Sequence, residues 1–319
     1  MDLIYMNEKK EDVGVVHDAT LDLAFGADEN DYECKIASVN HCCREGYYLY
    51  LESTEYGGIV DDIYIDADEI TYSGKTWHGI LNAKVLEPDA GEDYLVLNGE
   101  GNEMLAFLIA RMGLSALFKA STDASGINIR NYKMDRYIKG YDGIRKMLKA
   151  SGAKLNIAFK DGFVELSARP IVDYSKDEQF DTDQIRFKIK KRYHPLNHVI
   201  CLGKGDLAER EVIHVYADAS GNISDTQVFF GIEEVSDTYE NTNAKNSEEL
   251  RQGGIERIQE SWASNEIDFD FNADDYVYDI GDVVGAKERV TGIEVNEEIT
   301  KKIVKIQNNT TTISYKVGE

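Results

Sequence analysis

Short runs of alternating apolar and polar residues, separated by turn residues, most limit what this chain can fold into. Such runs occur at Gly46–Glu52, Ile59–Asp66 and Asp68–Gly74. We expect Ser73-Gly74-Lys75 to form a tight turn into a further strand at Thr76–Val85. Many short strands with regular turns are typical of sandwiches and barrels. Residues 1–90 therefore predict a β-barrel-like domain.

The pattern changes after Pro88. Met104, Leu105, Leu108 and Met112 have helical spacing, and Asn102 is the expected N-cap of this first helix. A second helix is expected from about residue 141 to 150, before a tight hairpin around the dipeptide at residues 161–162. Residues 91–172 therefore predict a small mixed domain, in which two helices pack on strands.

Residues 173–319 return to the strand pattern. His198–Leu202 and Arg210–Ala217 are expected to pair as antiparallel strands, separated by the turn-rich segment GKGDLAE. A phosphate-binding loop would lead into the N-terminus of a helix, whereas a β-branched run follows here. Asn246 and Glu249 form a capping-box pattern that begins a helical insertion at about 240–265. The predicted fold class is α+β, mostly β, with two β-barrel-like domains flanking the mixed domain.

The composition narrows the function classes. The formal net charge is −24, and a surface this negative repels nucleic acid, so we expect no specific DNA binding. No window contains the ~20 apolar residues that a membrane-spanning helix needs, and the start has no secretion-signal pattern. The chain has 4 cysteines, too few for a disulfide framework at this length, which indicates synthesis in a reducing cytoplasm.

The sequence contains no motif that predicts catalysis or a cofactor. The 6 histidines lie outside HExxH and nucleophile-elbow patterns, and no Walker lysine is present. His41-Cys42-Cys43, with Cys34 upstream, is the nearest approach to a metal cluster. If this segment is a strand, neighbouring side chains point to opposite faces and do not converge on one ion. We expect no catalytic residue, no cofactor, no metal and no enzymatic activity.

One strand presents a basic face in an otherwise acidic chain. This face consists of Arg186, Lys188, Lys190, Lys191 and Arg192. A patch of opposite charge suits contact with an acidic copy of the chain or an acidic partner. An ordinary solvated strand face explains the same pattern, and both interpretations stay open.

Aromatic residues of the first ninety positions suggest a second function class. Tyr48, Tyr50, Tyr64, Tyr72 and Trp77 could stack on sugars, although barrel strands are normally rich in such residues. The alternative function is therefore a carbohydrate-binding or cell-wall-degrading protein.

The order of the predicted domains resembles that of tail baseplate hub proteins of bacteriophages, prophages and related contractile particles. Three segments are similar to that family in their local sequence. They are EITYSGKTWHGILNAKVLEP, IRKMLKASGAKLNIAFKDGFVELSARPIVDYS and NHVICLGKGDLAEREVIHVYADASGNIS.

The resemblance implies a homotrimer whose β-domains build a ring that matches the tail tube. Such a hub joins the tail tube, or distal tail proteins, to a central spike or tail-tip protein. DNA or a tape-measure protein passes through its lumen without specific binding, and the negative charge of this chain suits that passage. The implied location is the virion tail baseplate, after assembly in the bacterial cytoplasm. Because the chain ends after a β-domain, we expect the purely structural kind of hub.

Overall fold

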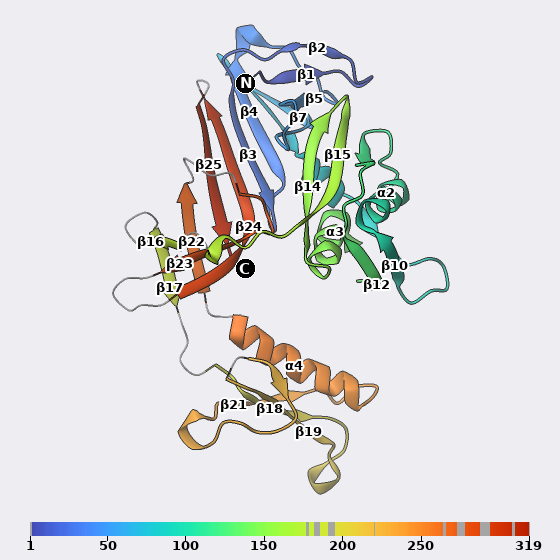
Figure 1. The fold of residues 1–319 in the computed structure, drawn as a ribbon, viewed down its shortest axis with the longest axis vertical. Coiled ribbons are helices and arrows are strands. Elements are labelled where there is room, and N and C mark those ends of the chain that lie inside the picture. The colour runs from blue at the N-terminus through green and yellow to red at the C-terminus, as the bar shows by residue number, and fades with distance from the viewer. Residues whose placement is uncertain are drawn as a thin grey trace. The chain divides into compact units, whose positions relative to one another are not determined.

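The computed structural model describes residues 2–176, 179–181, 186–190, 195–219, 221–263, 266–272, 278–287, 294–307 and 310–318. These residues form two compact units (Figure 1), each with its own hydrophobic core. Unit 1 comprises residues 1–186 and 269–318, and unit 2 comprises residues 187–268. The predicted domains 1–90, 91–172 and 173–319 divide the chain differently and remain a prediction. None of the helices in the described ranges is long and apolar enough to cross a membrane.

A large sheet in unit 1 combines strands from both ends of the chain. Its order is β17-β22-β25-β24-β3-β4-β8-β7, and β23 pairs with β24 and β16. Antiparallel pairing of β3 with β24 joins the two ends, and Figure 1 shows the red β24 and β25 on the side of the blue β3 and β4. The strands are β3 (Thr20–Gly26), β4 (Asp31–Ala37), β7 (Asp62–Asp66), β8 (Glu69–Lys75), β16 (Gln179–Asp181), β17 (Arg186–Lys190), β22 (Glu266–Asn272), β23 (Val283–Lys287), β24 (Glu294–Gln307) and β25 (Thr310–Val317).

Smaller sheets and three α-helices complete unit 1. The sheet orders are β2-β1-β5-β6, β10-β12, β11-β15-β14 and β13-β9. The strands are β1 (Ile4–Met6), β2 (Asp12–Val15), β5 (Tyr48–Tyr50), β6 (Gly57–Ile59), β9 (Val85–Leu86), β10 (Leu95–Glu100), β11 (Phe118–Ala120), β12 (Asn128–Met134), β13 (Ile138–Lys139), β14 (Ala153–Lys160) and β15 (Phe163–Pro170). The helices are α1 (Trp77–Asn82), α2 (Gly101–Arg111) and α3 (Gly140–Lys149), with short 3-10 turns η1 (Ser38–Asn40) and η2 (Tyr174–Lys176).

The middle of the chain confirms the sequence patterns most directly. The apolar stripes of α2 and α3 are buried against β14 and β15, in one core that also includes Trp77 of α1. Asp161 (φ +51°) and Gly162 (φ +75°) form the turn between β14 and β15, as the hairpin pattern predicted. Gly113, with φ +70°, follows the end of α2 in the left-handed conformation that suits a helix C-terminus.

Four local predictions were wrong. Residues 73–75 do not form a turn but continue β8, and residues 76–85 do not form the next strand, because Thr76 caps α1 by accepting a hydrogen bond from the Gly79 amide at 3.3 Å. The run Ile59–Asp66 is split between β6 and β7. The N-cap of α2 is Glu100, whose carboxylate accepts the amide of Asn102 at 2.7 Å, so Asn102 lies inside the helix.

Unit 2 is a four-stranded sheet with one helix on one face. The sheet order is β20-β19-β18-β21, with strands β18 (His198–Leu202), β19 (Val212–Ala217), β20 (Ile223–Ser224) and β21 (Ser236–Glu240). The loops contain the short turns η3 (Leu207–Glu209) and η4 (Gly231–Glu233), and the long helix α4 (Ser247–Ala263) lies across the sheet (Figure 1). Ile258 and Leu250 of α4 pack on Val199, Cys201 and Val215. The antiparallel β18–β19 pair and the capping of α4 by Asn246 were both predicted correctly.

The fold class is α+β and mostly β, as the sequence predicted. Within the described ranges the sheets are open, and none closes into a barrel. The predicted helical insertion exists as α4, and it belongs to a unit with a sheet of its own.

Candidate functional site

A buried polar cluster lies between the large sheet and α1 in unit 1. Lys302 of β24 donates from Nζ to the Glu55 carboxylate at 2.6 Å, and His78 Nε2 of α1 is 3.5 Å from the other oxygen of Glu55. His78 stacks on Phe25 with ring centroids 4.4 Å apart. These residues come from opposite ends of the chain, and no local sequence pattern connects them.

Pairing decides the charge state of this cluster. Burial alone would raise the pKa of Glu55, but Lys302 and then His78 outweigh it and lower the pKa to about 2. Burial opposes the charged form of Lys302, yet the neighbouring Glu55 carboxylate raises its pKa above the ordinary value. Burial lowers the pKa of His78, which therefore stays neutral beside the ion pair. The cluster is a charged pair with a neutral imidazole, an arrangement that suits structural cross-linking.

A second buried ion pair connects the central hairpin to a loop near the C-terminus. Lys154 Nζ of β14 lies 2.6 Å from Asp282 and 2.7 Å from Asp279. The second oxygen of Asp282 accepts the amide of Val172 at 2.9 Å. All members are satisfied by one another, so this cluster has the character of a structural cross-link.

Other charged side chains of β24 also form ion pairs with segments that are distant in the sequence. Lys301 pairs with Glu29, and Glu298 pairs with Arg145 and Lys149 of α3. Strand β24 is thereby tied by charge to an N-terminal loop and to a helix of the central segment. These contacts link segments of unit 1 that lie far apart in the sequence.

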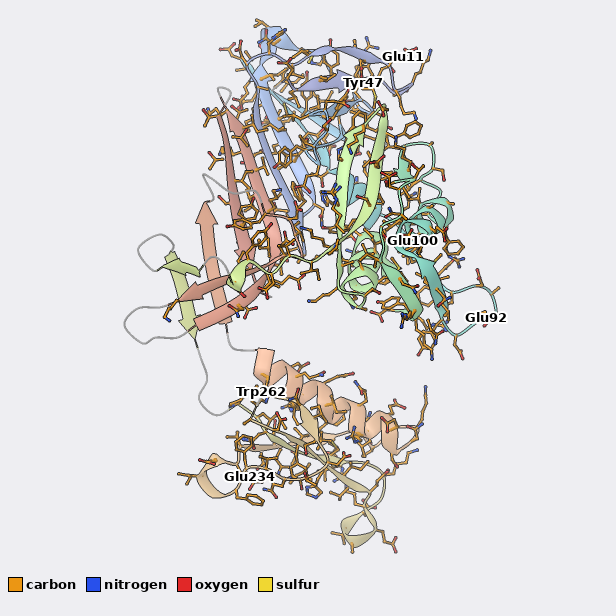
Figure 2. All side chains as sticks on the ribbon, in the orientation of Figure 1. Glu11, Tyr47, Glu92, Glu100, Glu234 and Trp262 are labelled. Carbon is orange, nitrogen blue, oxygen red and sulfur yellow. The ribbon has the colours of Figure 1, made fainter. Side chains whose placement is uncertain are left out.

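In unit 2, two histidines and a carboxylate form a hydrogen-bonded chain. His198 Nδ1 is 2.6 Å from the Glu234 carboxylate, and His198 Nε2 is 2.8 Å from His214 Nδ1. Glu234 (labelled in Figure 2) lies just before β21, while His198 and His214 come from β18 and β19. In the tautomer with the proton on Nδ1, His198 donates to the Glu234 carboxylate, and His198 Nε2 accepts from His214 Nδ1. The sequence analysis considered each histidine separately and did not predict these hydrogen bonds between His198, His214 and Glu234.

Two cysteines, a histidine and a tyrosine meet in the loop after η1. The amides of Cys42 and Cys43 donate to the Tyr72 hydroxyl at 3.0 and 3.2 Å, and the same oxygen is 2.9 Å from His41 Nδ1. The two sulfurs are 3.7 Å apart. Residues 41–44 are not in a strand, so the alternation that the sequence analysis assumed does not apply. No group of three metal-ligating residues is found among the residues that the structure describes.

The predicted site residues divide into two groups. The side chains of the basic face, Arg186, Lys188, Lys190, Lys191 and Arg192, lie outside the described residues. The predicted aromatic face does not form a surface, because Tyr50, Tyr72 and Trp77 are buried and Tyr48 is half-buried. Tyr64 alone of that set is exposed. The structure therefore offers no stacked aromatic platform for a sugar at these positions.

The open edge of the large sheet is the clearest candidate for a contact surface. Strand β7 ends the sheet, and it exposes Tyr64 (66%) and Ile65 (65%). An edge strand presents unpaired backbone groups that can bind another chain. Tyr64 and Ile65 are consecutive strand residues, so each face of this edge presents one exposed large side chain.

One of three comparisons with known proteins, that with solved structures, finds proteins of similar fold. No protein-family model matches the sequence, and a comparison with curated proteins finds no match. Among solved structures, the 43 kDa tail protein of prophage MuSo2 from Shewanella oneidensis is similar, with TM-score 0.59, 11% identity, and coverage of 99% of this chain and 98% of that chain. The prophage tail protein gp18 from Listeria monocytogenes gives TM-score 0.55, 12% identity, and coverage of 99% and 94%.

A tail protein from Neisseria meningitidis is similar as well, with TM-score 0.52, 12% identity, and coverage of 100% of this chain and 96% of that chain. All three likenesses extend over nearly the whole of both chains. The protein therefore has the fold of prophage tail proteins, as the sequence resemblance implied.

Proposed function

We propose that this protein is the structural hub of a phage or prophage tail baseplate. In this proposal three copies form a ring that joins the tail tube to the central spike or tail tip. The observation that carries the proposal is the whole-chain likeness in fold to three prophage tail proteins. The protein would act in the virion tail, with tail-tube and spike or tail-tip proteins as its partners.

The construction of unit 1 supports a mechanical role. Buried ion pairs join β24 to Glu55 and β14 to Asp282, so they cross-link segments far apart in the sequence. Breaking a buried pair costs about 3–5 kcal/mol, because the remaining charge is left without a partner. A subunit that transmits load between tube and spike needs such long-range cross-links.

Charge supports the passage of DNA through the ring. The net charge of −24 disfavours adhesion of the DNA backbone, since like charges repel. A lumen lined by this protein would let the polyanion slide without binding it.

We also propose that the protein has no catalytic activity of its own. The buried polar clusters around Lys302 and Lys154 are internally paired, an arrangement that suits stability. Incubation with purified peptidoglycan tests this part: release of soluble fragments by the wild type, abolished by a single substitution at Glu234, would overturn it.

The oligomeric state of the protein tests the proposal that it forms a trimeric hub. Native mass spectrometry and negative-stain imaging of the full chain should show a trimer with a central opening. We expect Ile65→Lys on the open edge to weaken the trimer, because a charge would be buried in the contact. Val96→Lys is the matched control, since Val96 is a strand residue of similar kind (49% exposed) on the small β10–β12 sheet.

A strict monomer, both alone and with its tail-tube partner, would overturn the ring. If the wild type and the Ile65→Lys variant are equally stable trimers, β7 is not part of the subunit contact. The proposal of a trimeric hub would then still stand.

A further inference from the structure

The loop between β4 and β5 holds two neighbouring thiols side by side. Because residues 41–44 are not in a strand, the side chains of Cys42 and Cys43 do not alternate, and their sulfurs are 3.7 Å apart. This separation is van der Waals contact between two sulfur atoms, and it also permits a weak S–H···S hydrogen bond.

Tyr72 of β8 fixes the backbone of this pair. Its hydroxyl accepts the amide protons of Cys42 and Cys43, at 3.0 and 3.2 Å. One oxygen atom therefore holds two successive peptide units, so the two sulfurs are kept in contact. Cys42 is half-buried and open to a small reagent, whereas Cys43 is fully buried behind it.

The contact makes the two thiols chemically unequal. The hydrogen bond from the Cys43 thiol, against the opposing effect of burial, lowers the pKa of Cys42 to about 7, and the same bond raises the pKa of Cys43. Burial raises the pKa of Cys34 to about 12, and it also raises the pKa of Cys201. Among the four cysteines, Cys42 combines thiolate character with access to solvent.

We propose that Cys42 and Cys43 form a redox modification site that a peroxide converts to a disulfide between neighbouring residues. The Cys42 thiolate attacks one peroxide oxygen, the O–O bond breaks, and the departing hydroxide takes a proton to become water. The resulting Cys42 sulfenic acid is then attacked by the Cys43 sulfur. The S–S bond forms, the S–O bond breaks, and the hydroxide leaves with the Cys43 proton as a second water.

This disulfide would be easily reversed. The Cα atoms of neighbouring residues are about 3.8 Å apart, shorter than the roughly 4.4–6.8 Å that unstrained disulfides span. A strained disulfide is readily reduced by a small thiol. The site would therefore be a dithiol in a reducing cytoplasm and would respond to oxidant outside it.

Peptide mapping of the intact, full-length protein after stepwise addition of hydrogen peroxide tests the proposal. We expect a Cys42–Cys43 disulfide that dithiothreitol reverses, with Cys201 still reduced. Cys43→Ala should stop the reaction at a sulfenic acid on Cys42, which dimedone traps. Cys201→Ala is the matched control and should behave as the wild type, because it also removes a buried thiol.

A second measurement does not depend on oxidation. The alkylation rate of Cys42 by iodoacetamide should rise with pH around a midpoint near 7, and Cys43→Ala should shift this midpoint upward. Circular dichroism confirms that each variant is folded. Oxidation that leaves Cys42 reduced, or that joins Cys42 to Cys34, would overturn the proposal, as would an alkylation midpoint that Cys43→Ala does not move.

Discussion

Lys302 illustrates how a single residue can connect distant parts of this chain. Its ammonium group is buried, and it pairs with Glu55 while lying 5.5 Å from the ring centroid of Tyr56. A buried lysine is stable only because the carboxylate and the aromatic ring replace the water that it loses. Removing either charge leaves the other without compensation.

Lys302→Ala should therefore destabilise unit 1 by about 3–5 kcal/mol, because the largely buried Glu55 carboxylate would lose its charged partner. Lys305→Ala is the control on the same strand. Lys305 pairs with Asp22 at 3.5 Å on an exposed surface, and such a pair contributes about 0–1 kcal/mol. Urea unfolding of both variants measures the difference, and equal losses would contradict the assignment.

The pH dependence of stability should follow from the same cluster. The pKa of Glu55 is lowered from 4.5 to about 2 in the folded state, so the unfolded state binds more protons between these values. The stabilisation is complete above about pH 4.5 and is lost as the pH falls toward 2. The lowered pKa of buried His78 acts in the same direction, beginning below about pH 6.5.

Thermal unfolding between pH 7 and pH 3 measures this effect. The melting temperature of unit 1 should fall on acidification, and Glu55→Gln should flatten the profile below pH 4.5. If the melting temperature of the variant falls as steeply with pH as that of the wild type, groups other than Glu55 cause the pH dependence of stability.

At the scale of elements, the contact of β3 with β24 depends on one glycine. The register of β24 with β25 shifts between Ile299 and Lys301, which places the Thr300 carbonyl against Gly26. A Cβ atom at Gly26 would lie 2.2 Å from that oxygen, and Gly26 also has φ +144°.

Gly26→Ala should consequently cost more than about 3 kcal/mol or prevent folding, since the clash is with backbone. Gly91→Ala is the matched control, because Gly91 also has positive φ (+90°) but nothing within 4 Å of an added Cβ. The control carries only the left-handed backbone penalty of about 1–2 kcal/mol. Soluble yield and urea midpoints separate the two effects, and similar losses would contradict the close approach.

At the scale of the whole molecule, the two units have separate hydrophobic cores. Leu148 of α3 belongs to the core of unit 1, and Leu250 of α4 belongs to that of unit 2, both fully buried. Units with independent cores unfold as independent cooperative transitions when few contacts cross their boundary.

Differential scanning calorimetry should show this independence. Leu250→Ala should destabilise unit 2 by about 2–5 kcal/mol and lower the melting temperature of that unit alone. Leu148→Ala should do the same to unit 1 and leave unit 2 unchanged. One transition that shifts in both variants would show that the units fold cooperatively.

Much of the local structure could be predicted from short-range patterns. The Asp161-Gly162 turn, the apolar stripe of α3 and the Asn246 cap of α4 each depend on a few neighbouring residues. Helix α1 was missed because it has only 6 residues, too few for a periodicity to appear beside a strand. Its N-cap, Thr76, was the one available signal.

The candidate sites were much less predictable. Lys302 meets Glu55 across 247 positions, and His198 meets Glu234 across 36, so no local pattern marks either pair. The contact of Cys42 with Cys43 was hidden because alternation holds only in a strand, and this segment is a loop.

The sequence alone specifies the Asp161-Gly162 turn, most helices and the strand-rich character, because these follow from the preferences of neighbouring residues. It also determined the strong negative charge, which is a sum over residues and needs no fold. Long-range packing, in contrast, brings β3 and β24 from opposite ends of the chain into one sheet and buries lysines beside carboxylates. Those outcomes depend on contacts between segments far apart in the chain, whose free energy appears only when all of them are in place.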